Sequence, residues 1–150
     1  MTQQRATYAQ AGVDVESGER AVELMRASIV ASSRPEVVGD FGGFSGLFDI
    51  SAAKSMRKPL LATSTDGVGT KIAVARALDI HHTVGLDLVA MVVDDLVVCG
   101  AEPLFMTDYI AVGSVNPERI ASIVSGIARG CELAGCSLVG GETAEHPGLM

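Results

Sequence analysis

The segment from Leu104 to Val139 constrains the fold most, because it predicts a strand, a helix and a second strand in direct succession. Asn116-Pro117-Glu118 supplies an N-cap, a proline at the first helical position and an early acid. Apolar residues then follow helical spacing up to Gly135: Ile120, Ile123, Val124, Ile127, Cys131 and Ala134. A chain with this order requires a sheet packed against helices.

Three more helices and two more strands are predicted from the remaining sequence. The helices are expected at residues 16–31, at residues 71–78 and along an apolar stripe that ends before Gly100. That stripe consists of Leu86, Val89, Val93, Leu96 and Val97. The strands are expected at residues 47–50 and, as a short buried strand, at residues 60–64. We therefore expect one α+β domain of α/β type, with one small mixed β-sheet and helices on one face.

Composition disfavours several functional classes. A net charge of −7 and an aromatic content of 4% are poorly suited to binding nucleic acid. The three cysteines include no C-x-x-C pair, and Cys99, in an apolar run, is expected to be a small core residue. No apolar leader follows residues 1–5, and three aspartates interrupt the most apolar window, residues 84–98. We expect a cytoplasmic protein without nucleic-acid or membrane partners.

Carboxylates and glycines concentrate in four short segments. Asp66 follows the strand predicted at residues 60–64, and Asp94 and Asp95 lie on a predicted helix. Glu142 follows the last predicted strand, in "GGETAE" (residues 140–145), whose adjacent glycines predict a loop. Oxygen ligands from separate elements suit Mg²⁺, which usually shares its coordination with nucleotide phosphates. Lys71 and the amides of Gly67 and Gly69 are candidates for neutralising those phosphates. Glycine is also dense in the loop at residues 39–46.

Each of these residues also has a structural interpretation. Asp66 beside Gly67 is an ordinary turn pair, the two helical aspartates suit a solvated face, and Glu142 suits a helix cap. The order Gly69-Thr70-Lys71 does not match a Walker loop, and no third glycine completes a dinucleotide fingerprint. The pair His81-His82 lacks a third ligand at metal-binding spacing and is interpreted as a turn, and His146 is similarly unsupported.

Five sequence segments together resemble a known family. "DLVVCGAEP" (residues 95–103) resembles the D-x-x-x-x-G-A-x-P signature of an ATP-binding superfamily that includes aminoimidazole ribonucleotide synthetase, selenophosphate synthetase and thiamine-monophosphate kinase. "YAQAGVD" (8–14), "RPEVVGDFGGFSGLF" (34–48), "TDGVGTK" (65–71) and "GCSLVGGETAEHPG" (135–148) then resemble the aminoimidazole ribonucleotide synthetase family itself. The resemblance runs nearly end to end.

This resemblance implies an ATP-dependent cyclo-ligase of purine biosynthesis. Such an enzyme converts formylglycinamidine ribonucleotide and ATP to aminoimidazole ribonucleotide, ADP and phosphate by phosphorylating the formamide oxygen. By position, Asp66, Asp95 and Glu142 would be Mg²⁺ ligands, and Lys71 and Asp94 would be catalytic. The residues that would bind the nucleotide are Gly42, Gly43, Gly46, Asp66, Gly67, Gly69, Thr70, Lys71 and Gly141.

The resemblance also implies an assembly and a domain organisation. The family suggests a homodimer in which the sheets of two copies pair into a barrel. Residues 1–150 would be the N-terminal ATP-binding domain, and the second α/β domain that the family places after "HPG" is absent from this sequence. Two alternatives stay open: a non-catalytic nucleotide-binding or dimerisation fragment, and another ATP-using member of the superfamily, such as a small-metabolite kinase.

Overall fold

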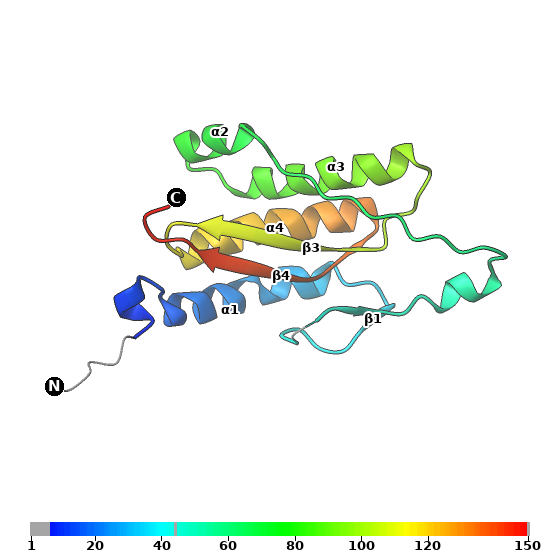
Figure 1. Cartoon of the computed structure of the whole chain (residues 1–150), viewed down its shortest axis with the longest axis horizontal. Helices are drawn as coiled ribbons and strands as arrows, with labels where there is room; N and C mark the ends of the chain where they lie inside the picture. Colours follow the sequence, from blue (N-terminus) through cyan, green and yellow to red (C-terminus); the bar gives the residue numbers. More distant parts are fainter. Residues whose placement is uncertain (1–6, 44, 150) are drawn as a thin grey trace.

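The computed structural model describes residues 7–43 and 45–149. Phe44, in the glycine-dense loop, and the start of the chain, including residues 1–5, lie outside these ranges. Within these ranges the chain forms four α-helices, four strands and two short 3-10 helices (Figure 1). The helices and strands are α1 (Val15–Ala31), β1 (Val37–Val38), β2 (Leu47–Phe48), α2 (Lys71–Leu78), α3 (His82–Val98), β3 (Phe105–Val112), α4 (Pro117–Ala134) and β4 (Ser137–Glu145). The 3-10 helices are Ala9–Ala11 and Ser51–Ser55. The predicted α+β class is confirmed.

Helix α4 forms as the local sequence predicts. The Asn116 side chain accepts a hydrogen bond from the Arg119 amide at 2.8 Å, and Pro117 occupies the first turn. At the other end Gly135 has a φ of 71°, and the Cys136 amide donates to the Cys131 carbonyl at 2.9 Å. This left-handed glycine cap ends the helix and turns the chain directly into β4.

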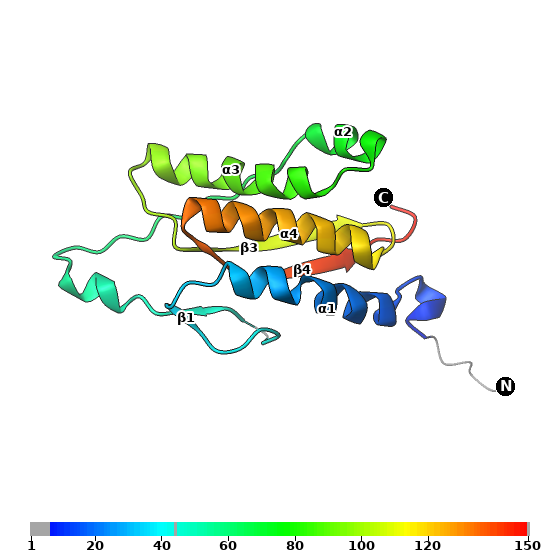
Figure 2. The same ribbon diagram turned by 180° about the vertical axis from the view of Figure 1, so that it is seen from behind.

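Strands β3 and β4 pair in parallel, with α4 as the connection between them. The register places Phe105 opposite Ser137 and Val112 opposite Glu145, with one irregularity between Met106 and Thr107. Figures 1 and 2 show α4 on one face of this sheet, with α2 and α3 on the β3 side and α1 with the β1–β2 hairpin on the β4 side. The helices therefore cover one face, as predicted.

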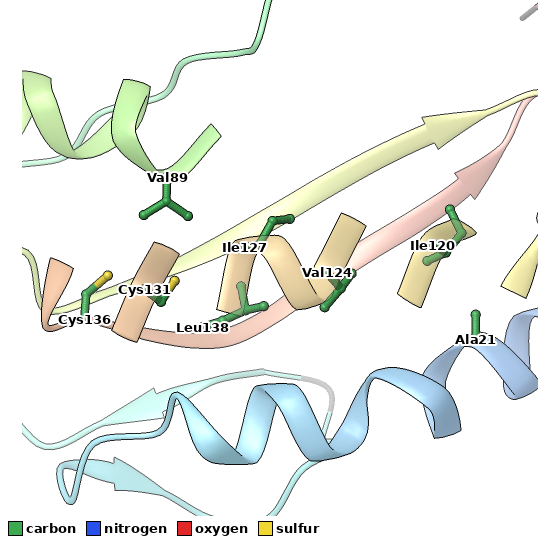
Figure 3. Close-up of a cluster of buried hydrophobic side chains, with 8 residues drawn as sticks. All are labelled: Ala21, Val89, Ile120, Val124, Ile127, Cys131, Cys136 and Leu138. Carbon is green, nitrogen blue, oxygen red and sulfur yellow. The ribbon is translucent and has the colours of Figure 1, made fainter. Parts of the chain in front are cut away.

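The core lies between these helices and the sheet (Figure 3). Its buried members come from α1, α3, α4, β4 and the turn before β4: Ala21, Val89, Ile120, Val124, Ile127, Cys131, Cys136 and Leu138. Glycine allows α3 and α4 to approach closely. A Cβ on Gly126 would lie 1.9 Å from the His82 carbonyl oxygen, and one on Gly85 would lie 2.1 Å from that of Ile123.

The predicted single mixed sheet is wrong. Within the described residues there are two separate two-stranded sheets, the antiparallel β1–β2 hairpin and the parallel β3–β4 pair. The strand predicted at residues 60–64 is also wrong, because this segment has no strand structure and Leu60 and Leu61 are 80% and 81% exposed. Apolar sequence predicts burial, but a strand also requires a backbone hydrogen-bonding partner.

Three local predictions need correction. Strand β4 extends to Glu145, so the residues that follow Val139 form a strand and not the loop suggested by their glycines. Cys99 is exposed, because it lies at the C-cap of α3, beyond the part of the helix that contacts the core. The apolar stripe of α3 is buried at Val89, whereas Leu86 and Val97 remain 38% and 57% exposed.

None of the described helices is both long and apolar enough to cross a membrane.

Candidate functional site

A cavity of about 640 Å³ lies between α1, the glycine-dense loop of the β1–β2 hairpin and the middle of β3 and β4. It brings together five residues assigned to the site from the sequence: Gly42, Gly43, Gly46, Gly141 and Glu142. Because the three loop glycines precede Gly141 and Glu142 by more than ninety positions in the chain, their convergence is a property of the tertiary structure.

Helix α1 forms the apolar wall of the cavity. Its N-cap is Asp14, whose carboxylate accepts hydrogen bonds from the Ser17 amide at 3.1 Å and the Ser17 hydroxyl at 2.8 Å. Met25 and Ile29 pack against the core, and the half-exposed Val22 lines the cavity, as the amphipathic pattern predicts. The wall is therefore held in place by its packing on α4.

Glu145 fixes the start of α1 relative to the end of β4. Its carboxylate accepts hydrogen bonds from the Asp14 amide at 2.9 Å and from the Val115 amide at 2.6 Å. These bonds join three segments that are far apart in the sequence. The sequence analysis did not select Glu145, although it lies within the "GGETAE" segment.

The glycines of the hairpin loop have two structural roles. Gly39 and Gly42 have φ values of 95° and 103°, in the left-handed region that favours glycine. Gly46 allows close packing, because a Cβ there would lie 2.5 Å from the Val139 carbonyl oxygen. The loop is therefore pressed against the backbone of β4 at one edge of the cavity.

Asp108 is a cavity residue that the sequence analysis missed. It lies on β3 directly opposite Gly141, and a Cβ on Gly141 would lie 1.7 Å from its carboxylate oxygen Oδ1. Burial raises the pKa of Asp108 to about 6, although the backbone amides of Asp108 and Glu142 offset part of this effect. The sequence feature that could have indicated this residue is that Asp108 is a lone acid in the apolar run of residues 104–112.

The remaining predicted site residues lie on the β3 side of the sheet, along α2, α3 and the segment that precedes α2 (Figures 1 and 2). They are Asp66, Gly67, Gly69, Thr70, Lys71, Asp94 and Asp95, and none of them lines the cavity. The Asp95 carboxylate accepts a 2.7 Å hydrogen bond from the Ser64 hydroxyl, and Lys71 Nζ lies 2.5 Å from Asp87 Oδ2. The structure thus divides the predicted site into two groups.

The predicted metal ligands do not form a ready-made cluster. In residues 7–43 and 45–149, no three His, Cys, Asp or Glu side chains gather closely enough to hold a metal ion. Asp66, Asp95 and Glu142 are nevertheless all exposed and all carry oxygen donors. This donor chemistry fits Mg²⁺, which keeps water ligands and shares phosphate oxygens.

The histidine pair has a structural role in this chain. His81 is buried between α2 and α3, and its Nε2 lies 2.8 Å from Asp79 Oδ1. Asp79 has a φ of 51° and its pKa is lowered, mainly by the hydrogen bond with His81 and then by the charge of Arg119. These contacts stabilise the turn between the two helices, in line with its interpretation from the sequence.

Comparison with known proteins supports the resemblance. Residues 50–149 match the family described as AIR synthase related protein, N-terminal domain. A phosphoribosylformylglycinamidine cyclo-ligase of Leptospira interrogans is 50% identical over 148 residues, which are 99% of this chain and 43% of the relative. Enzymes of the same name from Geobacillus thermodenitrificans and Desulfitobacterium hafniense are 58% and 56% identical, over 95% of this chain and 41% and 42% of the relatives.

The chain therefore spans about two fifths of the length of the curated relatives that it matches. The family match covers 100 of its 150 residues and includes α2, α3, α4 and both strands of the parallel sheet. The chain belongs to the AIR synthase related protein family and contains its N-terminal domain.

Proposed function

We propose that this chain is the ATP-binding part of a phosphoribosylformylglycinamidine cyclo-ligase. The observation that carries the proposal is the cavity on which the glycine loop, Gly141 and Glu142 converge. The names of the relatives support the reaction, in which formylglycinamidine ribonucleotide and ATP give aminoimidazole ribonucleotide, ADP and phosphate.

The proposed reaction has two steps. The formamide oxygen attacks the γ-phosphorus of ATP, and ADP leaves. The amidine nitrogen then attacks the activated carbon, the imidazole ring closes and phosphate leaves with the former formamide oxygen. Because phosphorylation creates the leaving group, the protein needs no nucleophile, and its task is to position the reactants and neutralise charge.

The two groups of site residues have complementary proposed roles. The amides of Gly42, Gly43 and Gly46 would surround the nucleotide at the cavity. Thr70 and the amides of Gly67 and Gly69 would approach its phosphates from the β3 side. Lys71 and Asp94 are the proposed catalytic residues. Lys71 would exchange its ion pair with Asp87 for a phosphate contact, since both partners are partly exposed.

Asp66, Asp95 and Glu142 are the proposed ligands of Mg²⁺, which when bound would neutralise charge on the phosphates. Because they are not clustered in the described part of the chain, we infer that the nucleotide itself bridges the two groups of residues. This arrangement predicts that metal and ATP bind together and that neither binds tightly alone.

Two copies of the chain are proposed to pair their sheets around a two-fold axis. Phe105 and Tyr109 on β3 are 47% and 63% exposed, and Leu60 and Leu61 are even more exposed. An apolar surface of this kind favours an obligate interface, on the order of 2,000 Å² or more. Sedimentation at low concentration tests the dimer, and a stable, well-folded monomer would contradict it.

The nucleotide proposal is tested by calorimetry of ATP binding with and without Mg²⁺. Asp66→Asn and Asp95→Asn should each weaken Mg-ATP binding far more than they lower the melting temperature. Glu132→Gln is a matched control, because Glu132 is an exposed carboxylate that pairs with Arg129 on its own helix. Unchanged affinity in both aspartate variants would remove them from the metal site.

The reaction is tested separately by ADP release. Release that requires formylglycinamidine ribonucleotide supports the cyclo-ligase, whereas release with another phosphorylated metabolite supports a small-metabolite kinase. ATP binding without ADP release would instead assign this chain a nucleotide-binding role.

A further inference from the structure

We propose that Asp108 is a positioning residue for Glu142: its carboxylate holds the β4 backbone at Gly141 and Glu142 and so directs the Glu142 side chain toward the nucleotide phosphates. This inference rests on the proposed function, because Glu142 has its assigned role only if Mg-ATP binds.

The strand register brings the two acids to adjacent positions on opposite faces of the sheet. Asp108 lies opposite Gly141, and Tyr109 lies opposite Glu142. Side chains alternate along a strand, and Met106 and Ile110 pack against the core, so Asp108 lies on the helix-covered face. Glu142 is exposed and belongs to the other face. Asp108 can therefore influence Glu142 only through the backbone of β4.

The contact with that backbone is close. A Cβ on Gly141 would lie 1.7 Å from Oδ1 of Asp108 and 2.8 Å from its Cγ, so the carboxylate occupies the space where a side chain would stand. Gly141 does not have a positive φ, and therefore no turn conformation requires a glycine there. At Gly140, its neighbour, the nearest atom of the described residues to an added Cβ is 3.8 Å away. The carboxylate of Asp108 accounts for glycine at position 141.

Packing alone does not explain an acid at position 108. The neighbouring positions on the same face of β3 are Met106 and Ile110, which pack against the core. Placing a carboxylate between them costs free energy, because the charged form loses water. The carboxylate packs against the β4 backbone at Gly141, and the backbone amides of Asp108 and Glu142 favour its charged form. The residue is thus suited to contact with that backbone, and poorly suited to filling the core.

The test compares three variants of the whole chain. Asp108→Leu keeps a similar size but removes the acceptor, whereas Asp108→Asn keeps both the shape and an acceptor oxygen. Thr107→Val is the matched control, because Thr107 is the preceding residue of β3 and is exposed on the opposite face. The measurements are hydrogen exchange of residues 140–143 without nucleotide, and ATP affinity as a function of Mg²⁺ concentration.

We expect Asp108→Leu to speed exchange at residues 140–143 and to weaken Mg-ATP binding about tenfold or more, a typical loss when the support of a ligand is removed. ATP binding without Mg²⁺ should not change. Asp108→Asn should bring both the exchange rate of residues 140–143 and the Mg-ATP affinity most of the way back to those of the unmodified chain. A purely structural role would not require this recovery. Asp108→Ala, which removes the acceptor without adding bulk, provides the same comparison if Asp108→Leu does not fold.

Two outcomes would overturn the inference, and they are distinguishable. If the unmodified chain binds Mg-ATP and Asp108→Leu binds it equally well with unchanged exchange, Asp108 does not position Glu142, and the nucleotide site stands. If the unmodified chain binds no Mg-ATP under any condition, the proposed function fails, and the role of Asp108 in directing Glu142 fails with it.

Discussion

The two sides of the β3–β4 sheet hold their candidate site residues in different ways. On the β4 side, close backbone contacts place the residues around a cavity. Gly46 packs against Val139, and Gly141 packs against the carboxylate of Asp108. On the β3 side, the residues are exposed and pair with neighbouring side chains, as Lys71 does with Asp87 and Asp95 with Ser64. The β4 side is therefore held by backbone packing, whereas the β3 side is held by side-chain contacts at the surface.

The two sides also depend on different helix contacts. Helix α1 and the bonds of Glu145 support the cavity, while α3 carries Asp94 and Asp95 of the β3 group and approaches α4 through Gly85 and Gly126. A substitution at the α3–α4 contact should therefore affect the β3 side first.

Gly126→Ala should produce the largest loss of stability. The added methyl group would lie 1.9 Å from the His82 carbonyl oxygen, and backbone atoms on both helices must move to accommodate it. We expect the free energy of unfolding to fall by roughly 3 kcal/mol or more, measured by urea denaturation. Amides of α3 should lose exchange protection before those of α1.

Gly18→Ala is the matched control for this prediction. An added Cβ on Gly18 meets no atom of residues 7–43 and 45–149 within 4 Å, and alanine favours a helix over glycine by up to about 1 kcal/mol. Its stability should rise slightly. Equal stability of Gly126→Ala and the unmodified chain would show that α3 does not depend on this contact.

The pH dependence of stability should reveal the buried carboxylate on the β4 side. The pKa of Asp108 is about 6 in the fold and 3.8 in its ordinary state. Between these values the unfolded chain loses the proton first, so the free energy of unfolding decreases as pH rises from about 4 to 6 and remains lower above pH 6. The total contribution is on the order of 3 kcal/mol.

Asp108→Asn should remove this contribution, so its stability relative to the unmodified chain should increase from pH 4 to pH 6.5. Asp49→Asn is a control of opposite sign, because hydrogen bonds from Ser51 lower the pKa of Asp49. Its stabilising contribution is present above the ordinary pKa and is lost in acid. Denaturation curves at several pH values check both, and parallel profiles for Asp108→Asn and the unmodified chain would rule out the buried charge.

Gly141→Ala tests the close contact beneath Asp108. The methyl group would collide with the carboxylate, and we expect a loss of about 2 kcal/mol, less than at Gly126 because a side chain can move more easily than a helix backbone. Gly140→Ala is the matched control, since an added Cβ there has only ordinary contacts, and its loss should stay below about 1 kcal/mol. Thermal and urea denaturation of the two variants compare them directly, and equal losses would contradict the proposed contact.

Lys71→Met should have the smallest effect on stability. Lys71 and Asp87 form a partly exposed ion pair, with side chains 47% and 35% accessible, and such surface pairs contribute less than about 1 kcal/mol. ATP affinity should nevertheless fall, because the proposed phosphate contact is lost. Asp87→Asn releases Lys71 and should leave ATP affinity equal or higher. If calorimetry shows no loss in Lys71→Met, the β3 side has no phosphate contact at this residue.

Much of the local structure followed from the sequence. The ends of α4 were predicted because Asn116, Pro117 and Gly135 act on their own neighbouring backbone. The partners of the strands were not predicted, since nothing local indicates that β2 pairs with Val37–Val38 or that residues 60–64 lack a partner. The glycines of "GGETAE" suggested a loop, although Gly141 is a strand residue that makes room for Asp108.

The approximate positions of the helices, the caps of α4, the α+β class and the family could be predicted from sequence, because they depend on neighbouring residues and on recognisable motifs. The distribution of the candidate site could not, because it is set by tertiary contacts. The cavity joins α1, the hairpin loop and β4, and the acid at position 108 meets the glycine at position 141 across the sheet. Such contacts depend on strand register and helix packing, which are set by interactions between residues far apart in the chain.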